Sequence, residues 1–416
     1  MDKQLWRIIL KELQRQQNSI NLIPSENYAD LETLFIVGSP LMNKYSEGYP
    51  QKRYYPGTAL MDKIEMLSIK RALRAFKLDS RQWSVNVQPY SGSPANLAAY
   101  LGLLNVGDKI MGLNLFHGGH LTHGHQANHS GKLFTTKQYC LNLQTEKIDY
   151  NEIAKLAYEF KPRLIISGTT AYPRIIDFSQ ISKIAKKIKA YHLADISHIA
   201  GLIIANLHPS PFHYADIVTT TTHKTLQGPR GAVIFMKKDL EKQINRSVFP
   251  GLQGGPHMQT IAAIAYTFKK ATTKQFLNYQ KQIIKNAKQL SLSLINRGFR
   301  LYSGGTENHL MIIDLKPLKI DGKKAEKILE LSGIIANRNA LPNDISPFNP
   351  SGIRLGTPAV TARGMEEKEM EIIAELIYKL LIKKINPKII KKTTQQLCSK
   401  FPLPYHKWYN TIIRGL

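Results

Sequence analysis

The stretch Gln88-Pro-Tyr-Ser-Gly-Ser-Pro-Ala-Asn96 carries the strongest fold signal in the chain. It follows a β-branched run, Val85 to Val87, and leads into a helical pattern, so it predicts a strand, a tight turn and a helix start. Ser93 suits the N-cap of that helix, and Pro94 suits its first position, where a missing N–H costs nothing. Backbone N–H groups and the helix dipole then converge on the Ser-Gly-Ser turn, which favours a phosphate cradle over an ordinary capped helix only if other groups support it.

Further strand-like runs alternate with helical patterns downstream of this turn. They are Lys109 to Leu113, Leu164 to Ser167, His192 to Ile196, Asp216 to Thr221 and Ala232 to Met236. The alternation predicts an α/β fold with a mostly parallel sheet covered by helices. In such sheets ligands bind at the C-terminal ends of the strands.

The pattern also predicts how the chain is divided. Residues 1–58 form an N-terminal helix and an aromatic-rich arm, residues 59–276 form the large domain, and residues 277–416 form a smaller α+β domain with a basic tail. A long helix is expected over 259–297, ending at a glycine, and a last helix over 365–384.

Composition limits the class of protein. The chain has 416 residues, of which 43 % are hydrophobic, so it can bury a globular core. It contains 57 Lys and Arg against 30 Asp and Glu, a formal net charge of +27. The basic residues are spread along helical stretches, which leaves compositional drift and attraction to polyanions as open readings.

Cysteine and hydropathy patterns predict a location. Cys140 and Cys398 are the only cysteines, too few for a disulfide framework, which is typical of a reducing cytosol and predicts a cytoplasmic protein. The first residues lack the pattern of a signal peptide, and no run of 18 apolar residues predicts a membrane span.

A lysine and an aspartate stand at predicted strand ends. Lys224 closes Thr219-Thr-Thr-Thr-His-Lys224, and a lysine desolvated beside a cation such as Arg230 can attack a carbonyl. Asp195 ends another apolar strand, where a carboxylate needs a cation or a proton donor. Taken singly, each has an ordinary structural reading. A phosphate cradle, an aspartate for a pyridinium nitrogen and a Schiff-base lysine together predict pyridoxal phosphate.

Two further motifs indicate which ligands the chain can bind. Histidines crowd between His117 and His129, which is a spacing that invites a metal site, but the Gly-Gly turn among them favours close approach of a flat ligand with one imidazole stacked on it. We therefore predict no metal. Arg354, between turn-forming residues, has the rigid fork that suits bidentate capture of a carboxylate.

Eight motifs, in order between about residue 20 and residue 380, resemble those of a known family. They are Leu22-Ile-Pro-Ser-Glu-Asn27, Asn43-Lys-Tyr-Ser-Glu-Gly-Tyr49, Arg53-Tyr-Tyr55, the Ser91 turn, His117 to Gly124, Thr219 to Lys224, Gln253-Gly-Gly-Pro256 and Ser351 to Pro358. The chain resembles the serine hydroxymethyltransferases. The resemblance implies a fold-type I pyridoxal-phosphate enzyme with a seven-stranded sheet, a homodimer with shared active sites, and conversion of L-serine and tetrahydrofolate to glycine and 5,10-methylenetetrahydrofolate.

The resemblance also implies a cofactor site. Lys224 would form the internal aldimine, Asp195 would keep the pyridine nitrogen protonated, and His120 would stack on the ring. The expected phosphate ligands are Ser91, Gly92 and Ser93, joined across the dimer by Tyr45, Gly254 and Gly255. The remaining expected cofactor contacts are Thr170, His198 and His223.

For the substrates, the resemblance implies that Arg354 and Ser25 bind the amino-acid carboxylate. Glu47 would transfer the proton at the serine hydroxyl, and Tyr55 would line the pocket. The expected pterin contacts are Leu115, Gly119, Leu121 and Asn339. A base near neutral pH is what loss of formaldehyde from serine requires, so the residue-level chemistry agrees.

Two alternatives remain at this stage. A threonine or allothreonine aldolase would share Lys224 and Asp195 but would have no reason to keep Glu47 with Leu121 and Asn339. A non-catalytic basic RNA-binding protein could retain the fold, although the catalytic groups are intact, so we expect no requirement for nucleic acid.

Overall fold

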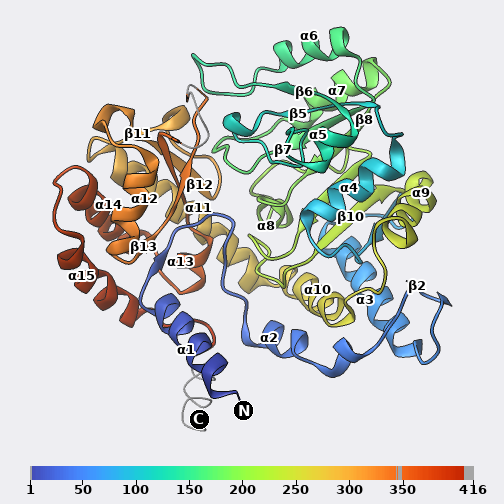
Figure 1. Ribbon diagram of the computed structural model, residues 1–416, viewed down its shortest axis with the longest axis horizontal. Coiled ribbons are helices and arrows are strands. Elements are labelled where there is room, and N and C mark those ends of the chain that lie inside the picture. The colour runs from blue at the N-terminus through green and yellow to red at the C-terminus, as the bar shows by residue number, and fades with distance from the viewer. Residues whose placement is uncertain (1, 343, 345–348, 407–416) are drawn as a thin grey trace. The chain divides into compact units, whose positions relative to one another are not determined.

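The computed structural model describes residues 2–342, 344 and 349–406 and divides into two compact units (Figure 1). Residues 29–280 form the large unit, and residues 1–28 with 281–416 form the small unit. The three-part division expected from the sequence stays a prediction, because the arm's role in a dimer is part of it.

The large unit is built on a seven-stranded sheet, which confirms the predicted fold class. Its strands, in spatial order, are β4 (Trp83–Asn86), β10 (Ala232–Lys237), β9 (Ile217–Thr221), β8 (Tyr191–Asp195), β7 (Leu164–Gly168), β5 (Lys109–Leu113) and β6 (Thr135–Tyr139). Only β10 runs antiparallel to its neighbours. The C-terminal ends of the other six strands therefore share one edge of the sheet.

Helices cover both faces of this sheet, and β10 shows how. Ile234 joins a core cluster with α4 (Gly92–Leu103) and α9 (Glu241–Arg246). The next residue, Phe235, contacts Phe76 and Phe268 from the opposite layer, where α3 (Ala59–Ala75) and α10 (Met258–Ala271) pack together. Since successive side chains of a strand point to opposite faces, a continuous apolar run fits a strand buried on both sides.

Shorter elements complete the large unit. The helices are α2 (Leu31–Val37), α5 (His129–Leu133), α6 (Tyr150–Phe160), α7 (Phe178–Lys187) and α8 (Ala200–Ile204), and a small hairpin pairs β2 (Gly48–Tyr49) with β3 (Lys52–Arg53). The aromatic-rich arm thus contains local structure that its weak periodicity did not predict.

Two sequence predictions in this unit were wrong in detail. The expected helix over 259–297 is two helices, α10 and α11 (Lys274–Ile295), because the hydroxyls of Thr272 and Thr273 donate to the carbonyls of Lys269 and Lys270 and compete with the helical ladder. The cap of α4 is Ser91 rather than Ser93. Pro94 falls within the first turn, where no intrahelical N–H bond is lost.

The small unit has a four-stranded sheet of its own. Its strands, in spatial order, are β11 (Arg300–Leu301), β12 (Leu310–Asp314), β15 (Gly352–Gly356) and β14 (Asn337–Asn339), and β1 (Ile20–Asn21) pairs separately with β13 (Ile334–Ile335). Its helices include α1 (Lys3–Gln17), α12 (Gly322–Leu331), α13 (Pro358–Ala362) and α14 (Glu367–Leu381). The division between the units falls within α11, whose residues from Lys281 onward belong to the small unit. This confirms a smaller α+β layer with a buried apolar core.

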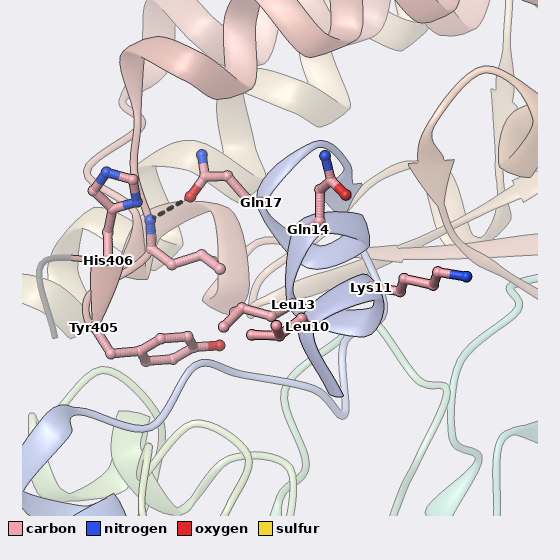
Figure 2. A pocket seen from close by; sticks show the side chains of 8 residues that line it. Leu10, Lys11, Leu13, Gln14, Gln17, Tyr405 and His406 are labelled. Atoms are coloured by element: carbon pink, nitrogen blue, oxygen red, sulfur yellow. Dashed lines mark hydrogen bonds between the residues drawn. The ribbon is translucent and has the colours of Figure 1, made fainter. Parts of the chain in front are cut away.

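The C-terminal segment is more ordered than predicted. The last described helix is α15 (Pro387–Lys400), not the one expected over 365–384, and its Leu397 and Cys398 lie in the small unit's core. Beyond it the chain returns to α1, where the Leu403 amide donates to Gln17 Oε1 at 3.0 Å beside a largely apolar cavity of about 350 Å³ (Figure 2). Residues 407–416 of the predicted tail lie outside the described residues.

None of the described helices combines the length and the apolar character needed to cross a membrane.

Candidate functional site

The phosphate cradle predicted from the sequence lies where β4 leads into α4. Ser91 is the N-cap, so the amides of Gly92 and Ser93 occupy first-turn positions that have no intrahelical acceptor. A Cβ on Gly92 would lie 2.7 Å from Thr221 Cγ2, at the end of β9, so any other residue here would require the Thr221 side chain to shift. Amides and the positive end of a 12-residue helix therefore meet the C-terminal edge of the sheet, which suits a phosphate.

Asp195 is the most tightly held charged group at this edge. Its Oδ2 accepts from Asn96 Nδ2 at 2.9 Å and lies 3.3 Å from His123 Nε2, while its Oδ1 accepts from the Ser197 amide at 3.0 Å. Burial would raise the pKa of Asp195, but the contacts with His123, the charge of Lys224 and the Ser197 side chain lower that pKa below its ordinary value. The carboxylate therefore stays anionic, as a pyridinium partner must.

A hydrogen-bonded chain links Asp195 to His120. Thr219 donates to Asn96 Oδ1 at 2.7 Å, which fixes the amide so that its Nδ2 donates both to Asp195 and to Thr122 Oγ1 at 2.9 Å. Thr122 Oγ1 lies 2.7 Å from His120 Nδ1, and the Thr122 amide donates to that same nitrogen at 3.2 Å. The imidazole predicted to stack on the cofactor is thus oriented by the same network that holds the aspartate.

Lys224 and His223 follow the end of β9. Both side chains are partly buried. Burial, together with the charges of Lys224 and Arg230, lowers the pKa of His223 to about 3, so this imidazole is neutral at physiological pH. The charge of Lys224 also contributes to the lowered pKa of Asp195, which brings the predicted lysine and aspartate into one electrostatic environment.

The Gly-Gly turn after β5 approaches the backbone after β7 very closely. A Cβ on Gly118, whose φ is +92°, would lie 2.5 Å from the Ala171 carbonyl. The Thr170 hydroxyl donates to the Gly119 carbonyl at 2.6 Å, so this predicted cofactor contact also fixes the turn. The predicted pterin contacts differ in exposure, since Leu115 is partly buried and Leu121 is exposed.

The histidine-rich segment divides its rings among separate partners. His117 Nδ1 accepts from the Leu141 amide, His120 contacts Thr122, and His123 contacts Asp195. Within the described residues, no three side chains of the metal-binding types converge as ligands. His198, also predicted at the cofactor, is buried at the end of β8, and its carbonyl accepts from Thr225.

A second cluster gathers the arm with the glycine loop after residue 253. The rings of Tyr45 and Tyr55 have centroids 5.2 Å apart, and a Cβ on Gly255 would lie 2.9 Å from Tyr45 Cε1. A Cβ on Gly254 would lie 3.1 Å from Glu47 Oε1. Five predicted residues are therefore brought together within one chain.

This cluster adjoins the phosphate cradle. Tyr90, which precedes Ser91, donates its hydroxyl to the Gly255 carbonyl at 2.8 Å, and its backbone amide donates to Gln253 Oε1 at 3.0 Å. Burial and the nearby Tyr45 and Glu47 raise the pKa of the Tyr90 phenol.

Buried ion pairs hold the hairpin that carries Glu47 and Tyr55. Arg53 lies 2.8 Å from Asp62 and 2.6 Å from Glu65, and it also donates to the Gly48 carbonyl. A paired buried charge is costly to break, so the hairpin has a fixed position on α3.

The other predicted residues belong to the small unit and are described within it. Arg354, on β15, donates from Nε to Asn337 Oδ1 at 3.3 Å, and burial lowers the pKa of its guanidinium to about 10. Ser25 lies in the turn after Pro24, against which Gly356 packs closely. Asn339, on β14, donates to the Ala340 carbonyl at 2.7 Å.

Sequence reasoning missed the residues that connect the site. Asn96, Thr122, His123 and Thr219 hold Asp195 and His120, yet none was predicted as a site residue. Asn96 stands four residues after Gly92 and therefore one helical turn above the cradle, which is a signal that could have identified it.

Together these residues fit pyridoxal phosphate. At the cradle a Cβ on Gly92 would crowd Thr221, the carboxylate of Asp195 is held anionic, and the charge of Lys224 helps to lower the pKa of that carboxylate. A comparison with protein-family models gives an independent result, because the model described as serine hydroxymethyltransferase matches residues 1–377. Since the match spans most of the chain, this protein belongs to the serine hydroxymethyltransferase family, whose members use pyridoxal phosphate as cofactor and tetrahydrofolate as co-substrate.

Proposed function

We propose a role for each site residue of this chain in the family's reaction, the reversible conversion of L-serine and tetrahydrofolate to glycine and 5,10-methylenetetrahydrofolate. The observation that carries the proposal is the buried, anionic Asp195 within the field of Lys224 at the sheet edge. Pyridoxal phosphate, when bound, supplies the electron sink that breaking the Cα–Cβ bond of serine requires.

In this proposal the large unit holds the cofactor. Lys224 would hold it covalently, Asp195 would keep its ring nitrogen protonated, and His120 would pack on the ring. Ser91, Gly92 and Ser93 would hold the phosphate. Contacts from Thr170, His198 and His223 complete the site, and the neutral state of His223 avoids a second cation beside Lys224.

Further residues bind the substrates. Arg354 with Ser25 holds the amino-acid carboxylate, because a desolvated guanidinium binds a carboxylate bidentately and strongly. Tyr55 lines the amino-acid pocket. The pterin contacts are Leu115, Gly119, Leu121 and Asn339.

Glu47 transfers the proton at the serine hydroxyl. We expect Glu47→Gln to keep cofactor and glycine binding while the folate-dependent turnover number for serine falls about 10²–10³-fold, since the amide cannot accept that proton. Steady-state kinetics with serine and tetrahydrofolate, and a spectroscopic glycine titration, measure the two effects. Glu159→Gln, an exposed residue of α6, is the matched control. Turnover at the level of the control would remove Glu47 from this role.

We also propose a cytoplasmic homodimer with shared active sites, with no membrane or nucleic acid required. Tyr45 and Tyr55 are exposed beside the loop of Gly254 and Gly255, and Tyr54 is exposed beside Phe249. These exposed aromatic rings support contact with a second chain. We expect a solution mass of about twice the 47.1 kDa chain by light scattering, shifted toward one chain by Tyr54→Glu and unaffected by Tyr158→Glu on α6. A single-chain mass for the unaltered protein at micromolar concentration would contradict the dimer.

A further inference from the structure

The backbone turn just after Lys224 is held in a conformation that its residue type disfavours. Gln227 has a φ of +56°, in the left-handed region, where the Cβ of an L-residue crowds the neighbouring backbone. Its amide donates to the Lys224 carbonyl at 3.0 Å, and the Gly228 amide donates to the Thr222 carbonyl at 2.8 Å. A relaxation at Gln227 would therefore move the backbone of Lys224.

Lys270, on α10, holds this turn from outside the site. Its Nζ donates to the Gln227 carbonyl at 3.2 Å and to Gln227 Oε1 at 3.3 Å. One ammonium group therefore binds both the backbone and the side chain of Gln227. The ammonium is also 2.9 Å from Asp30 Oδ2. Hydrogen bonds from a charged donor are about twice as strong as neutral ones.

Further hydrogen bonds hold Asp30 in its ion pair with Lys270. Asp30 caps α2, and its Oδ2 accepts a further hydrogen bond from the Tyr266 hydroxyl at 3.0 Å. Burial would raise the pKa of Asp30, but the charge and hydrogen bond of Lys270 and the bonds from Thr33 lower it below its ordinary value. The Asp30 carboxylate therefore remains charged at neutral pH.

We infer that Lys270 is a positioning residue that fixes Lys224 for the cofactor by clamping Gln227 in its left-handed conformation. This inference rests on the proposed role of Lys224. Lys270 touches neither substrate nor cofactor in it, and acts only through the turn.

The first test is cofactor retention. We expect Lys270→Met to raise the dissociation constant for pyridoxal phosphate about tenfold or more in the holoprotein, and Lys270→Arg to restore most of it. Lys269→Met, the exposed neighbour on the same helix, is the control. A Lys270→Met variant that unfolds at lower temperature but keeps the control's dissociation constant would overturn the inference.

A double-mutant cycle with Gln227→Gly identifies the route of the effect. Glycine adopts a positive φ without a Cβ penalty, so the clamp becomes unnecessary and Lys270→Met should cost less than about threefold in that background. An undiminished loss in the glycine background would show that Lys270 does not act through Gln227. The cycle also covers the case in which Lys270→Met folds poorly alone, because Gln227→Gly removes the need for the clamp.

Hydrogen exchange separates this inference from the proposed function. The substitution Lys270→Met is tested in two apoproteins, one with the native Lys224 and one with Lys224→Gln. In both, we expect it to speed amide hydrogen exchange at Gln227 and Gly228 about tenfold. Unchanged exchange would overturn the clamp even if Lys224 holds the cofactor. A different pair of results would retain the clamp and reject the role of Lys224. In that case exchange is faster in Lys270→Met, and Lys224→Gln gives the cofactor spectrum of the unaltered protein after pyridoxal phosphate is added.

Discussion

Lys224→Gln will fold normally and lose the visible absorbance of the bound cofactor, and its turnover of serine with tetrahydrofolate will fall by about 10³-fold or more. Glutamine keeps a polar, unbranched side chain, one bond shorter than that of lysine, but has no amine that can join an aldehyde. The partly buried setting of residue 224 accepts this change, because the turn is held by backbone bonds such as that from the Gln227 amide.

Three measurements check this expectation. Absorption spectra after incubation with excess cofactor, borohydride trapping followed by peptide mapping, and thermal unfolding of the apoprotein report attachment, its position and the fold. Lys242→Gln, an exposed lysine on α9, is the matched control. A label that remains on the protein at another lysine, or absorbance equal to the control's, would show that Lys224 is not the attachment point.

Asp195→Asn is expected to keep the cofactor attached and to lower the turnover number by about 10²–10³-fold. The amide has nearly the same shape, but it carries no charge to keep a ring nitrogen protonated. In the unaltered protein Asn96 Nδ2 donates to the Asp195 carboxylate at 2.9 Å. In the variant an NH₂ group replaces one carboxylate oxygen and cannot accept such a hydrogen bond. A buried donor that loses its acceptor is destabilising by about 1–3 kcal/mol, so some loss of stability should accompany the loss of rate.

The pH dependence sharpens this test. Although burial raises the pKa of Asp195, its contacts lower the net pKa below the ordinary value, so its stabilising contribution is present above the unfolded pKa and is lost only as the pH falls toward the folded one. We therefore expect no break from Asp195 between about pH 5 and pH 9 in the rate profile. Kinetics over this range, with exposed Asp239→Asn as the control, measure both effects. Turnover equal to the control's would exclude Asp195 from the reaction.

Much of the central sheet could be predicted from the chain alone. The strand expected over Lys109 to Leu113 has the bounds of β5. The strands expected from Leu164 and Ala232 end one residue before β7 and β10 do, and the strand expected from His192 is displaced by one residue from β8. These strands are buried on both faces, so their apolar runs stand out from the flanking helices. The edge strand β6 was missed because the first four residues of Thr135–Tyr139 are all polar, as in many loops, and alternate only between exposed and partly buried positions.

The candidate site divides in a similar way. The groups expected to react, Lys224 and Asp195, stand in strand-end motifs that can be recognised in the linear sequence. The groups that hold them do not, since Asn96 reaches Asp195 from 99 residues away and Lys270 reaches Gln227 from a separate helix. Such contacts depend on how helices pack on a sheet, which local periodicity does not encode.

The sequence by itself determined the order of strands and helices, the glycine turns, and the placing of a lysine and an aspartate at strand ends, because short-range sterics and hydrophobic periodicity govern all of these. Only the tertiary structure decided which groups are buried together. That pairing sets the charge of Asp195, the neutrality of His223, the orientation of His120 and the clamp on Gln227, because desolvation and hydrogen bonding act through space between segments far apart in the chain.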